Sequence, residues 1–163
     1  MDILGFMRMQ RELQIKMKEA NPALGGDPYE MTDEELAVFV TWNFTALVKE
    51  LGEALDEVGW KPWASSRHCN GGAAMKEMVD AWHFFLNIML ALGAWDQATI
   101  PDVAEVFTLG YIEKNAKNLQ RQVEGYDGVA GKCPECHREI EPPAGGLPRV
   151  GYRCPCGNYI EGA

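Results

Sequence analysis

Two glutamates in the first half of the chain have the types and spacing of a metal or catalytic site: Glu50 and Glu53, with Asp56 and Glu57 close behind them. Residues three positions apart are neighbours on one face of a helix, so Glu50 and Glu53 would project together. A solvated helix surface explains this pair as well as a cation site does. The pair alone therefore leaves both interpretations open, and the solvated surface is the commoner one.

A second acidic pair, Glu77 and Asp80, repeats the three-residue spacing in the segment Glu-Met-Val-Asp. This pair heads a strongly apolar stretch, where a carboxylate is costly to bury without a partner. Two antiparallel helices that face each other would bring all four carboxylates together. Oxygen-only ligands of this kind suit Mg²⁺ or Mn²⁺. With the second pair, a metal site becomes as good an interpretation as a solvated surface.

The segments that carry these acids are predicted to be helices. Apolar periodicity and helix-breaking residues indicate helices over 3–20, 32–58, 75–92 and 101–124. Thr32 and Glu35 have the spacing of a capping box, and Gly59 and Gly93 are predicted to end the second and third helices. Little strand-type alternation precedes residue 130. The main domain is therefore predicted to be all-α, a helical bundle.

Four cysteines near the end of the chain form a second candidate site. Cys133 and Cys136 are a Cys-x-x-Cys pair, and Cys154 and Cys156 are a Cys-x-Cys pair. Four thiolates suit a closed structural Zn²⁺ site, and paired cysteines in a reducing compartment indicate metal binding rather than disulfides. We predict a small zinc ribbon. His137 in place of one thiol, or unligated free cysteines, are the alternatives.

Composition and charge limit the possible functions of the 163-residue chain. The change to proline, glycine and cysteine near residue 130 predicts an all-α main domain over 1–129 and a zinc-ribbon module over 130–163. The net charge of −9 argues against binding of duplex nucleic acid by the main domain. We find no apolar run of membrane-spanning length and no export signal, so a cytoplasmic protein without membrane contact is expected.

Four blocks of the sequence, in order, resemble the dimeric dUTPases of the all-α nucleoside triphosphate pyrophosphatase superfamily. The blocks are MQRELQ, ELGEALDEVGWKPW, EMVDAWHFFLN and KNAKNLQRQVEGYDG, which lie within residues 7–128. Gln14 stands where that family usually has asparagine. The resemblance implies an all-helical homodimer, and the tail after residue 130 lies outside it.

The resemblance also implies hydrolysis of dUTP to dUMP and pyrophosphate, with water attacking the α-phosphorus. Glu50, Glu53, Glu77 and Asp80 would be the catalytic carboxylates that hold Mg²⁺ or Mn²⁺. The substrate-binding residues would be Gln10, Gln14, Lys61, Trp63, His83, Phe84, Lys114, Asn115, Asn118, Arg121 and Tyr126. The two glutamines would read the pyrimidine edge, and the cationic side chains would neutralise phosphate oxygens.

Plainer interpretations of these residues stay open at this point. Without the resemblance, residues 114–121 are an ordinary polar helix end, and Phe84 and Trp63 are core residues. Trp42, Trp82 and Trp95 are predicted to lie in the core. Two other functions remain: a broader nucleotide pyrophosphatase that acts on dCTP or other nucleotides, and a non-catalytic helical dimer with a zinc-ribbon binding module.

Overall fold

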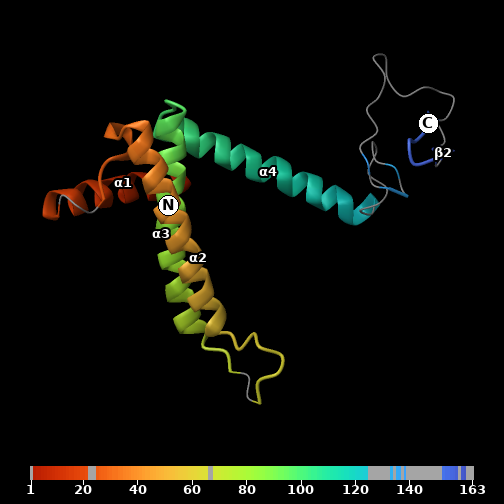
Figure 1. Ribbon diagram of the computed structural model, residues 1–163, viewed down its shortest axis with the longest axis horizontal. Helices are drawn as coiled ribbons and strands as arrows, with labels where there is room; N and C mark the ends of the chain where they lie inside the picture. Colours follow the sequence, from red (N-terminus) through yellow and green to blue (C-terminus); the bar gives the residue numbers. More distant parts are fainter. Residues whose placement is uncertain are drawn as a thin grey trace. The chain divides into compact units, whose positions relative to one another are not determined.

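The structure is a computed structural model that describes residues 2–21, 25–65, 68–124, 133, 135–136, 138, 152–157 and 159–160. The described elements follow the order α1 (Ile3–Ala20), the 3₁₀ helix η1 (Pro28–Glu30), α2 (Asp33–Asp56), α3 (Gly71–Trp95), α4 (Ile100–Glu124), β1 (Tyr152–Arg153) and β2 (Tyr159–Ile160) (Figure 1). The predicted all-α main domain is confirmed. The chain forms two compact units, Met1–Thr108 and Leu109–Ala163, which are described separately.

Helices α2 and α3 form an antiparallel hairpin in the first unit and lie side by side (Figure 1). Their register is fixed at two levels: Asn43 meets Asn87 near one end, and Glu50 meets Glu77 farther along. The predicted capping box begins α2, because the Glu35 amide donates to Thr32 Oγ1 at 3.3 Å and the Thr32 amide donates to the Glu35 carboxylate at 2.8 Å. The hairpin thus presents one face of each helix to the other.

Helix α3 is longer than predicted, since it begins at Gly71 rather than Met75 and continues beyond Gly93 to Trp95. Gly93 therefore does not end the helix. A Cβ atom at this position would lie 2.3 Å from Val103 Cγ2, so glycine is needed there for the close approach of α4. The expectation that Gly93 ends the helix was wrong because glycine also serves where two helices pack closely.

The hydrophobic core lies where α1, the end of α3 and the start of α4 meet. Its buried side chains are Met7, Leu86, Met89, Leu90, Ile100 and Ala104. Met7 and Leu90 are wholly inaccessible to solvent. The core anchors the end of the hairpin that carries Asn43 and Asn87 and leaves the end that carries the carboxylates outside it.

The predicted core position of three tryptophans is wrong. Trp42, Trp82 and Trp95 are 61%, 36% and 42% exposed. They belong to a wider set of exposed apolar side chains in the first unit, which on α2 and α3 includes Val38, Phe44, Val48, Leu51, Met75 and Val79. So many exposed large apolar side chains on two paired helices are unusual for a monomer.

By length and composition alone, α3 could cross a membrane, contrary to the expectation that no apolar run is long enough; only the described residues were searched. The core helix of a soluble protein passes the same test. Helix α3 carries Glu77 and Asp80, and its second half is buried against the rest of the first unit. Its apolar character is thus accounted for by packing.

The second unit contains the end of α4 and the cysteine-rich tail. Strands β1 and β2 pair antiparallel, with Tyr152 opposite Ile160 and Arg153 opposite Tyr159, on either side of the Cys-x-Cys segment. A cysteine cluster with a short hairpin is the arrangement expected of a small metal module. The predicted domain boundary between residues 129 and 130 follows α4 and stays a prediction.

Candidate active site and cysteine cluster

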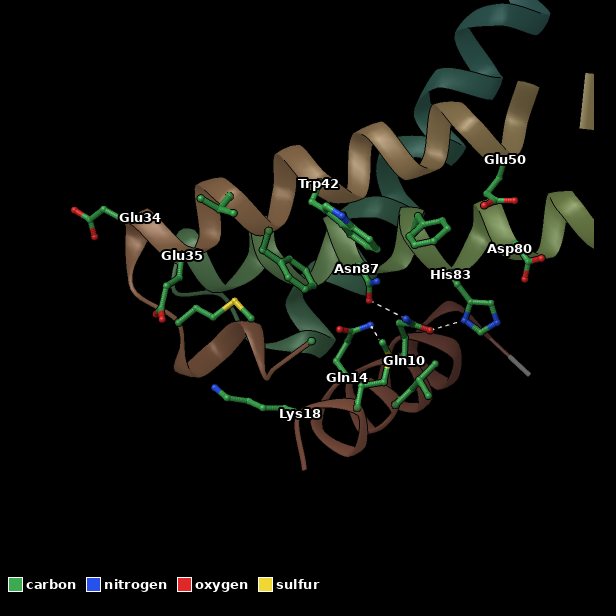
Figure 2. Close-up of a pocket in the computed structure, with 17 residues that line it drawn as sticks. Gln10, Gln14, Lys18, Glu34, Glu35, Trp42, Glu50, Asp80, His83 and Asn87 are labelled. Atoms are coloured by element: carbon green, nitrogen blue, oxygen red, sulfur yellow. Dashed lines mark hydrogen bonds between the residues drawn. The ribbon is translucent and has the colours of Figure 1, made fainter. Parts of the chain in front are cut away.

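Three of the four predicted metal ligands come together between α2 and α3. One carboxylate oxygen each from Glu50, Glu53 and Glu77 lies within 4.8 Å of the other two. Asp80 is not part of this group, but it lines the same pocket as Glu50 and lies close to it (Figure 2). The i, i+3 spacing and the antiparallel hairpin therefore bring together three of the four carboxylates that were expected to converge.

This carboxylate cluster fits the ligand set of a small hard cation. Oxygen atoms around octahedral Mg²⁺ are about 3 to 4.2 Å apart, as its bond length of about 2.1 Å requires. The observed spacing of 4.8 Å or less reaches that range with small side-chain movements. Lys49 forms an ion pair with Glu53 and offsets part of the negative charge. The other two carboxylates have no cation partner among the described residues.

A pocket of about 990 Å³ opens beside the carboxylate cluster, within the first unit. Its walls come from α1, α2 and α3, and it contains six of the predicted site residues: Gln10, Gln14, Glu50, Asp80, His83 and Phe84 (Figure 2). Trp42 also lines the pocket, where its ring meets Phe84 edge-to-face with centroids 5.7 Å apart. The volume is at the upper end of the range for small-molecule sites.

A chain of hydrogen bonds crosses the floor of this pocket and links all three helices. His83 Nδ1 lies 2.6 Å from Gln10 Oε1, and Gln10 Nε2 donates to Asn87 Oδ1 at 2.8 Å (Figure 2). Asn87 Nδ2 donates to Asn43 Oδ1 at 2.8 Å, and Asn43 Nδ2 donates to the Phe39 carbonyl at 2.7 Å. The amides of Gln10, Asn43 and Asn87 are at most 2% exposed. Burial makes these polar contacts strong and costly to break.

Gln14 is the second buried amide of α1, and its environment differs from that of Gln10. Its side chain is 5% exposed, and its Nε2 lies 3.8 Å from Met17 Sδ. Within the described part of the chain, this weak contact is its only side-chain hydrogen bond. A buried amide that lacks strong partners is free to bind a ligand that enters the pocket.

The loop after α1 holds the Gln14 side of the pocket in place. Gly25 has φ +65°, and a Cβ there would lie 3.1 Å from Gln14 Oε1. Arg11 anchors the loop through two hydrogen bonds to the buried Asp27 carboxylate, from Nε at 2.9 Å and from Nη2 at 2.5 Å. Burial acts to raise the pKa of Asp27, but the bonds from Arg11 and the Tyr29 amide prevail and lower it.

Lys61 and Trp63 lie outside the pocket. Both belong to the loop between α2 and α3, where the Lys61 ammonium is 5.7 Å from the centre of the Trp60 ring. Trp63 meets Trp60 edge-to-face and is 74% exposed. Asp56, a further possible ligand by its spacing, accepts a hydrogen bond from Trp60 Nε1 at 3.1 Å. The substrate roles of Lys61 and Trp63 stay predictions.

Apart from Lys61, the predicted phosphate-binding residues belong to the second unit. Lys114, Asn118 and Arg121 lie on α4 at spacings of four and three residues, which put them on one helix face. Asn115 is exposed on the same helix. Tyr126 lies outside the described residues. The phosphate-binding role of this group stays a prediction.

Asn43 and Asn87 are site residues that the sequence-based prediction missed. Each stands alone in an apolar run, Asn43 in FVTWNFTALV and Asn87 in FFLNIML. Asparagine is a poor helix former and is rarely buried without a partner. Two such residues on neighbouring helices are a signal that they bind each other, and this signal could have identified the pair.

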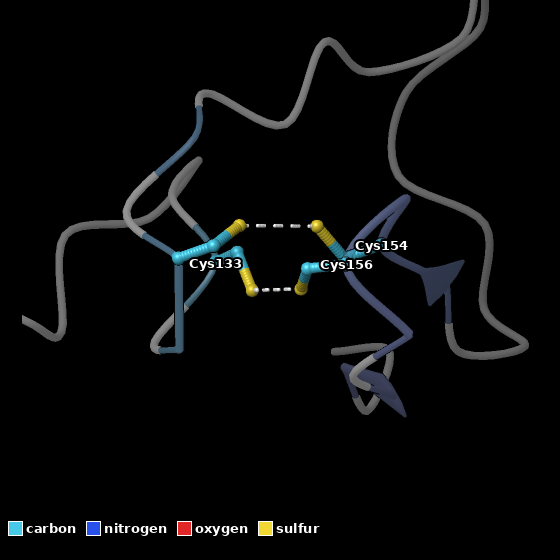
Figure 3. Close-up of side chains that lie close together, drawn as sticks. Cys133, Cys154 and Cys156 are labelled. Carbon is cyan, nitrogen blue, oxygen red and sulfur yellow. Dashed lines mark hydrogen bonds between the residues drawn. The ribbon is translucent and has the colours of Figure 1, made fainter.

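The four predicted zinc ligands also come together. Cys133 Sγ lies 3.6 Å from Cys156 Sγ, Cys136 Sγ lies 3.5 Å from Cys154 Sγ, and all four sulfurs are within 4.8 Å of one another (Figure 3). These distances exceed a disulfide bond of about 2.05 Å. Tetrahedral Zn²⁺ with bonds of about 2.3 Å separates its sulfur ligands by about 3.8 Å. The cluster therefore fits zinc. The alternative ligand, His137, lies outside the described residues.

Two thiols of the cysteine cluster have pKa values that are shifted in opposite directions. A hydrogen bond from the Cys136 backbone amide lowers the pKa of Cys133 to about 6. The Cys156 amide acts to lower the pKa of Cys154, but burial and the neighbouring sulfurs raise it to about 12. A bound cation would favour the thiolate form of Cys154, because metal ligation requires a deprotonated sulfur.

Comparisons with known proteins bear on the first unit and its pocket. The sequence model of the dUTPase family matches residues 2–106, which include the carboxylate cluster and the whole pocket lining. A curated relative, the dCTP pyrophosphatase of Enterobacteria phage LZ5, is 27% identical over 143 aligned residues, which cover 72% of this chain and 78% of the relative. No solved structure matches the chain significantly.

Proposed function

The chain belongs to the dUTPase family, and from this premise we propose that it hydrolyses dUTP to dUMP and pyrophosphate. Both the family and the phage dCTP pyrophosphatase support a nucleotide pyrophosphatase. One observation carries the proposal for this chain: a single pocket has Glu50 and Asp80 at one end, beside the carboxylate cluster, and buried amides in its floor. Carboxylates suit the metal–phosphate end of a nucleotide, and amides suit the edge of its base.

The spacing of the two groups matches the two ends of a nucleotide. Asn43 and Glu50 are on the same helix, and the seven residues between these levels correspond to about 10 Å of helix. A substrate whose base lies over the amides would place its phosphates near Glu50. Phe84, between these levels, and Trp42, whose ring meets Phe84, present apolar surface to the sugar and base.

Glu50, Glu53, Glu77 and Asp80 would hold Mg²⁺ or Mn²⁺ in this reaction. When bound, the cation supplies positive charge that offsets the triphosphate and polarises the attacking water. The carboxylates align the water with the α-phosphorus, and we assign Glu50, which lines the pocket, as the acceptor of the water's proton. Lys49, which forms an ion pair with Glu53, would compete with the cation for this carboxylate.

Base selectivity rests on the amides, and we propose that dUTP is preferred over dCTP and dTTP. Where uracil has a carbonyl acceptor and an N–H donor, cytosine has an amino donor and an acceptor nitrogen. A buried amide of fixed orientation rejects the wrong edge, since one polar group would stay unpaired. Gln14 has a free amide for this task. The phage relative's dCTP activity supports a second candidate, preference for dCTP.

Three further parts of the proposal rest on other residues. Lys61, Lys114 and Arg121 would neutralise phosphate oxygens, while Asn115, Asn118 and Tyr126 would donate to them. The cysteine cluster would hold one structural Zn²⁺, as its sulfur spacing supports. The protein would act as a cytoplasmic homodimer, because the exposed apolar side chains of α2 and α3 need a partner.

Pyrophosphate release from dUTP, dCTP and dTTP, each measured with Mg²⁺ and with a chelator, tests the proposal. We expect Mg²⁺-dependent release that is fastest with dUTP and at least 100-fold slower for Glu50→Gln, about the loss typical of one catalytic group. Glu105→Gln, an exposed acid on α4, is the matched control and should keep full activity. Equal rates with all three nucleotides would indicate the broader enzyme, and faster dCTP release would indicate the second candidate. If no pyrophosphate were released from any of the three nucleotides, the proposed pyrophosphatase activity would be refuted.

A further inference from the structure

The hydrogen-bond chain under the pocket ends in a group that cannot change its role. The Phe39 carbonyl only accepts hydrogen bonds, whereas a side-chain amide can be turned to present either its oxygen or its nitrogen. Asn43 must therefore direct Nδ2 to Phe39 and Oδ1 to Asn87. The backbone of α2 thus fixes the orientation of the first amide.

The same reasoning passes along the chain to the imidazole ring. Because Asn43 Oδ1 accepts, Asn87 must donate Nδ2 to it and direct its own oxygen to Gln10. Gln10 then donates Nε2 to Asn87 and presents Oε1 to His83. An oxygen acceptor 2.6 Å from His83 Nδ1 requires the proton to be on Nδ1. The neutral ring is therefore left with a lone pair on Nε2.

We propose that Asn43 is a positioning residue for base selectivity, which acts through Asn87 to fix the amide of Gln10 and the tautomer of His83. Asn43 is wholly buried and does not line the pocket, so it has no contact with a substrate there. Gln10, Asn87 and His83 do line it. The proposal rests on the proposed function, because it concerns which pyrimidine edge the pocket accepts.

Fixed orientation matters because uracil and cytosine present opposite donor and acceptor patterns. Gln10 keeps one N–H and one oxygen lone pair beyond its bonds to Asn87 and His83. If the amide turned over, these two groups would exchange places, and the pocket would match the other base. Loss of the anchor at Asn43 should therefore weaken discrimination more than catalysis itself.

The ¹⁵N NMR spectrum of His83 in the unmodified protein is the first test, at about pH 8, above the usual histidine pKa of about 6.5. We expect protonated Nδ1 and unprotonated Nε2. Protonation of Nε2 instead would overturn the proposal with no variant and no activity measurement. A failure of the proposed function, which would show as absence of nucleotide hydrolysis, leaves this spectrum unaffected, so the two failures are distinguishable.

Two substitutions of Asn43 separate positioning from packing. Asn43→Asp keeps an oxygen that faces Asn87 in either protonation state, so it should retain the His83 tautomer and the dUTP to dCTP ratio of kcat/KM. Asn43→Leu removes donor and acceptor, so His83 should show both tautomers and the ratio should change by about tenfold toward unity. Thr45→Val, the control, removes a similar bond to the i−4 carbonyl on the exposed side of α2.

The His83 tautomer and the nucleotide preference of Asn43→Leu decide whether Asn43 has more than a packing role. If folded Asn43→Leu keeps the Nδ1 tautomer and a ratio within twofold of the unmodified protein, Asn43 has only a packing role. If Asn43→Leu does not fold, Asn43→Asp and the spectrum of the unmodified protein decide. A change of tautomer in Thr45→Val would also refute the proposal, because it would show that any loss in α2 disturbs His83.

Discussion

Replacing Glu77 by glutamine should reverse the order of stability between the variant and the unmodified protein when Mg²⁺ is added. Glu77 lies within 4.8 Å of Glu50 and Glu53, and Lys49 neutralises only Glu53. Two unit charges at that separation repel by about 3.5 kcal/mol at an effective dielectric constant of 20 and by about 0.9 kcal/mol in bulk water. Since Glu77 is half-buried, relief of repulsion should stabilise the metal-free variant by about 1–2 kcal/mol.

The effect of Mg²⁺ has the opposite sign. A ligand at a concentration of about 100 times its Kd stabilises the protein that binds it by about 2.7 kcal/mol. The unmodified protein should gain this stabilisation, and Glu77→Gln should lose most of it because one of its ligands is gone. One kcal/mol corresponds to about 2–4 °C in Tm for a chain of this size. The variant should therefore melt a few degrees higher in chelator and several degrees lower in Mg²⁺.

Differential scanning calorimetry of both proteins, with chelator and across a Mg²⁺ titration, measures this reversal. Glu105→Gln makes the same chemical change at an exposed position outside the cluster and should follow the unmodified protein in both conditions. The reasoning would be refuted if Glu77→Gln were less stable in chelator, or if Mg²⁺ raised the Tm of both proteins equally.

Three other predictions concern the loop, the helix packing and the tail. Asp27→Asn should lower the free energy of unfolding in urea by about 2 kcal/mol at neutral pH, because a buried charge-assisted bond is lost. The pKa of Asp27 is lower in the folded than in the unfolded protein. The stability difference should therefore be present above the unfolded-state pKa and disappear as the pH falls through the folded-state pKa. Gly93→Ala should lower the Tm, as its Cβ would lie 2.3 Å from Val103 Cγ2, at a cost of about 1–3 kcal/mol. Cys154→Ser should lose bound zinc in elemental analysis, whereas Cys69→Ser, which changes an exposed thiol outside the cluster, should keep it.

Each of these predictions has its own contrary result. An Asp27→Asn protein that loses as much stability at acid pH as at neutral pH would show that the carboxylate charge is unimportant. Gly110→Ala, where nothing lies within 4 Å of the added Cβ, should stabilise α4, so a lower Tm in both glycine variants would contradict the steric argument. Purified protein without zinc, prepared without chelator, would contradict the metal module.

The carboxylate cluster was predictable from the sequence because its geometry is periodic. Residues at i and i+3 share a helix face whatever the surroundings, so Glu50 and Glu53 need only a facing helix with Glu77. Cysteine pairs are equally local, which is why the four cysteines that meet in the cluster could be identified from the sequence. The helix ends were less predictable, because Gly93 serves close packing against Val103, a contact that the spacing of apolar residues does not reveal.

Two parts of the site depend on three-dimensional contacts that no local pattern specifies. The chain from His83 to the Phe39 carbonyl joins three helices, and its members are up to 77 positions apart in sequence. Trp42 was expected in the core because tryptophan is apolar, yet the isolated chain leaves it 61% exposed beside the pocket. Apolar periodicity identifies a face that will be covered, but not whether the cover is the same chain or another molecule.

The uneven burial of the hairpin connects its stability with its proposed activity. The buried residues that anchor α3, Leu86 through Leu90, lie next to α1 and α4, whereas the level of Glu50 and Glu77 is buried only around Ala54 and Ala81. Such a segment has little apolar burial to offset the repulsion of its own carboxylates, so it belongs to the less stable part of the protein. A cation at the carboxylates supplies the missing attraction, and an apolar partner over α2 and α3 supplies the missing burial. Substrate chemistry and structural order at this end of the hairpin should therefore depend on the same ion.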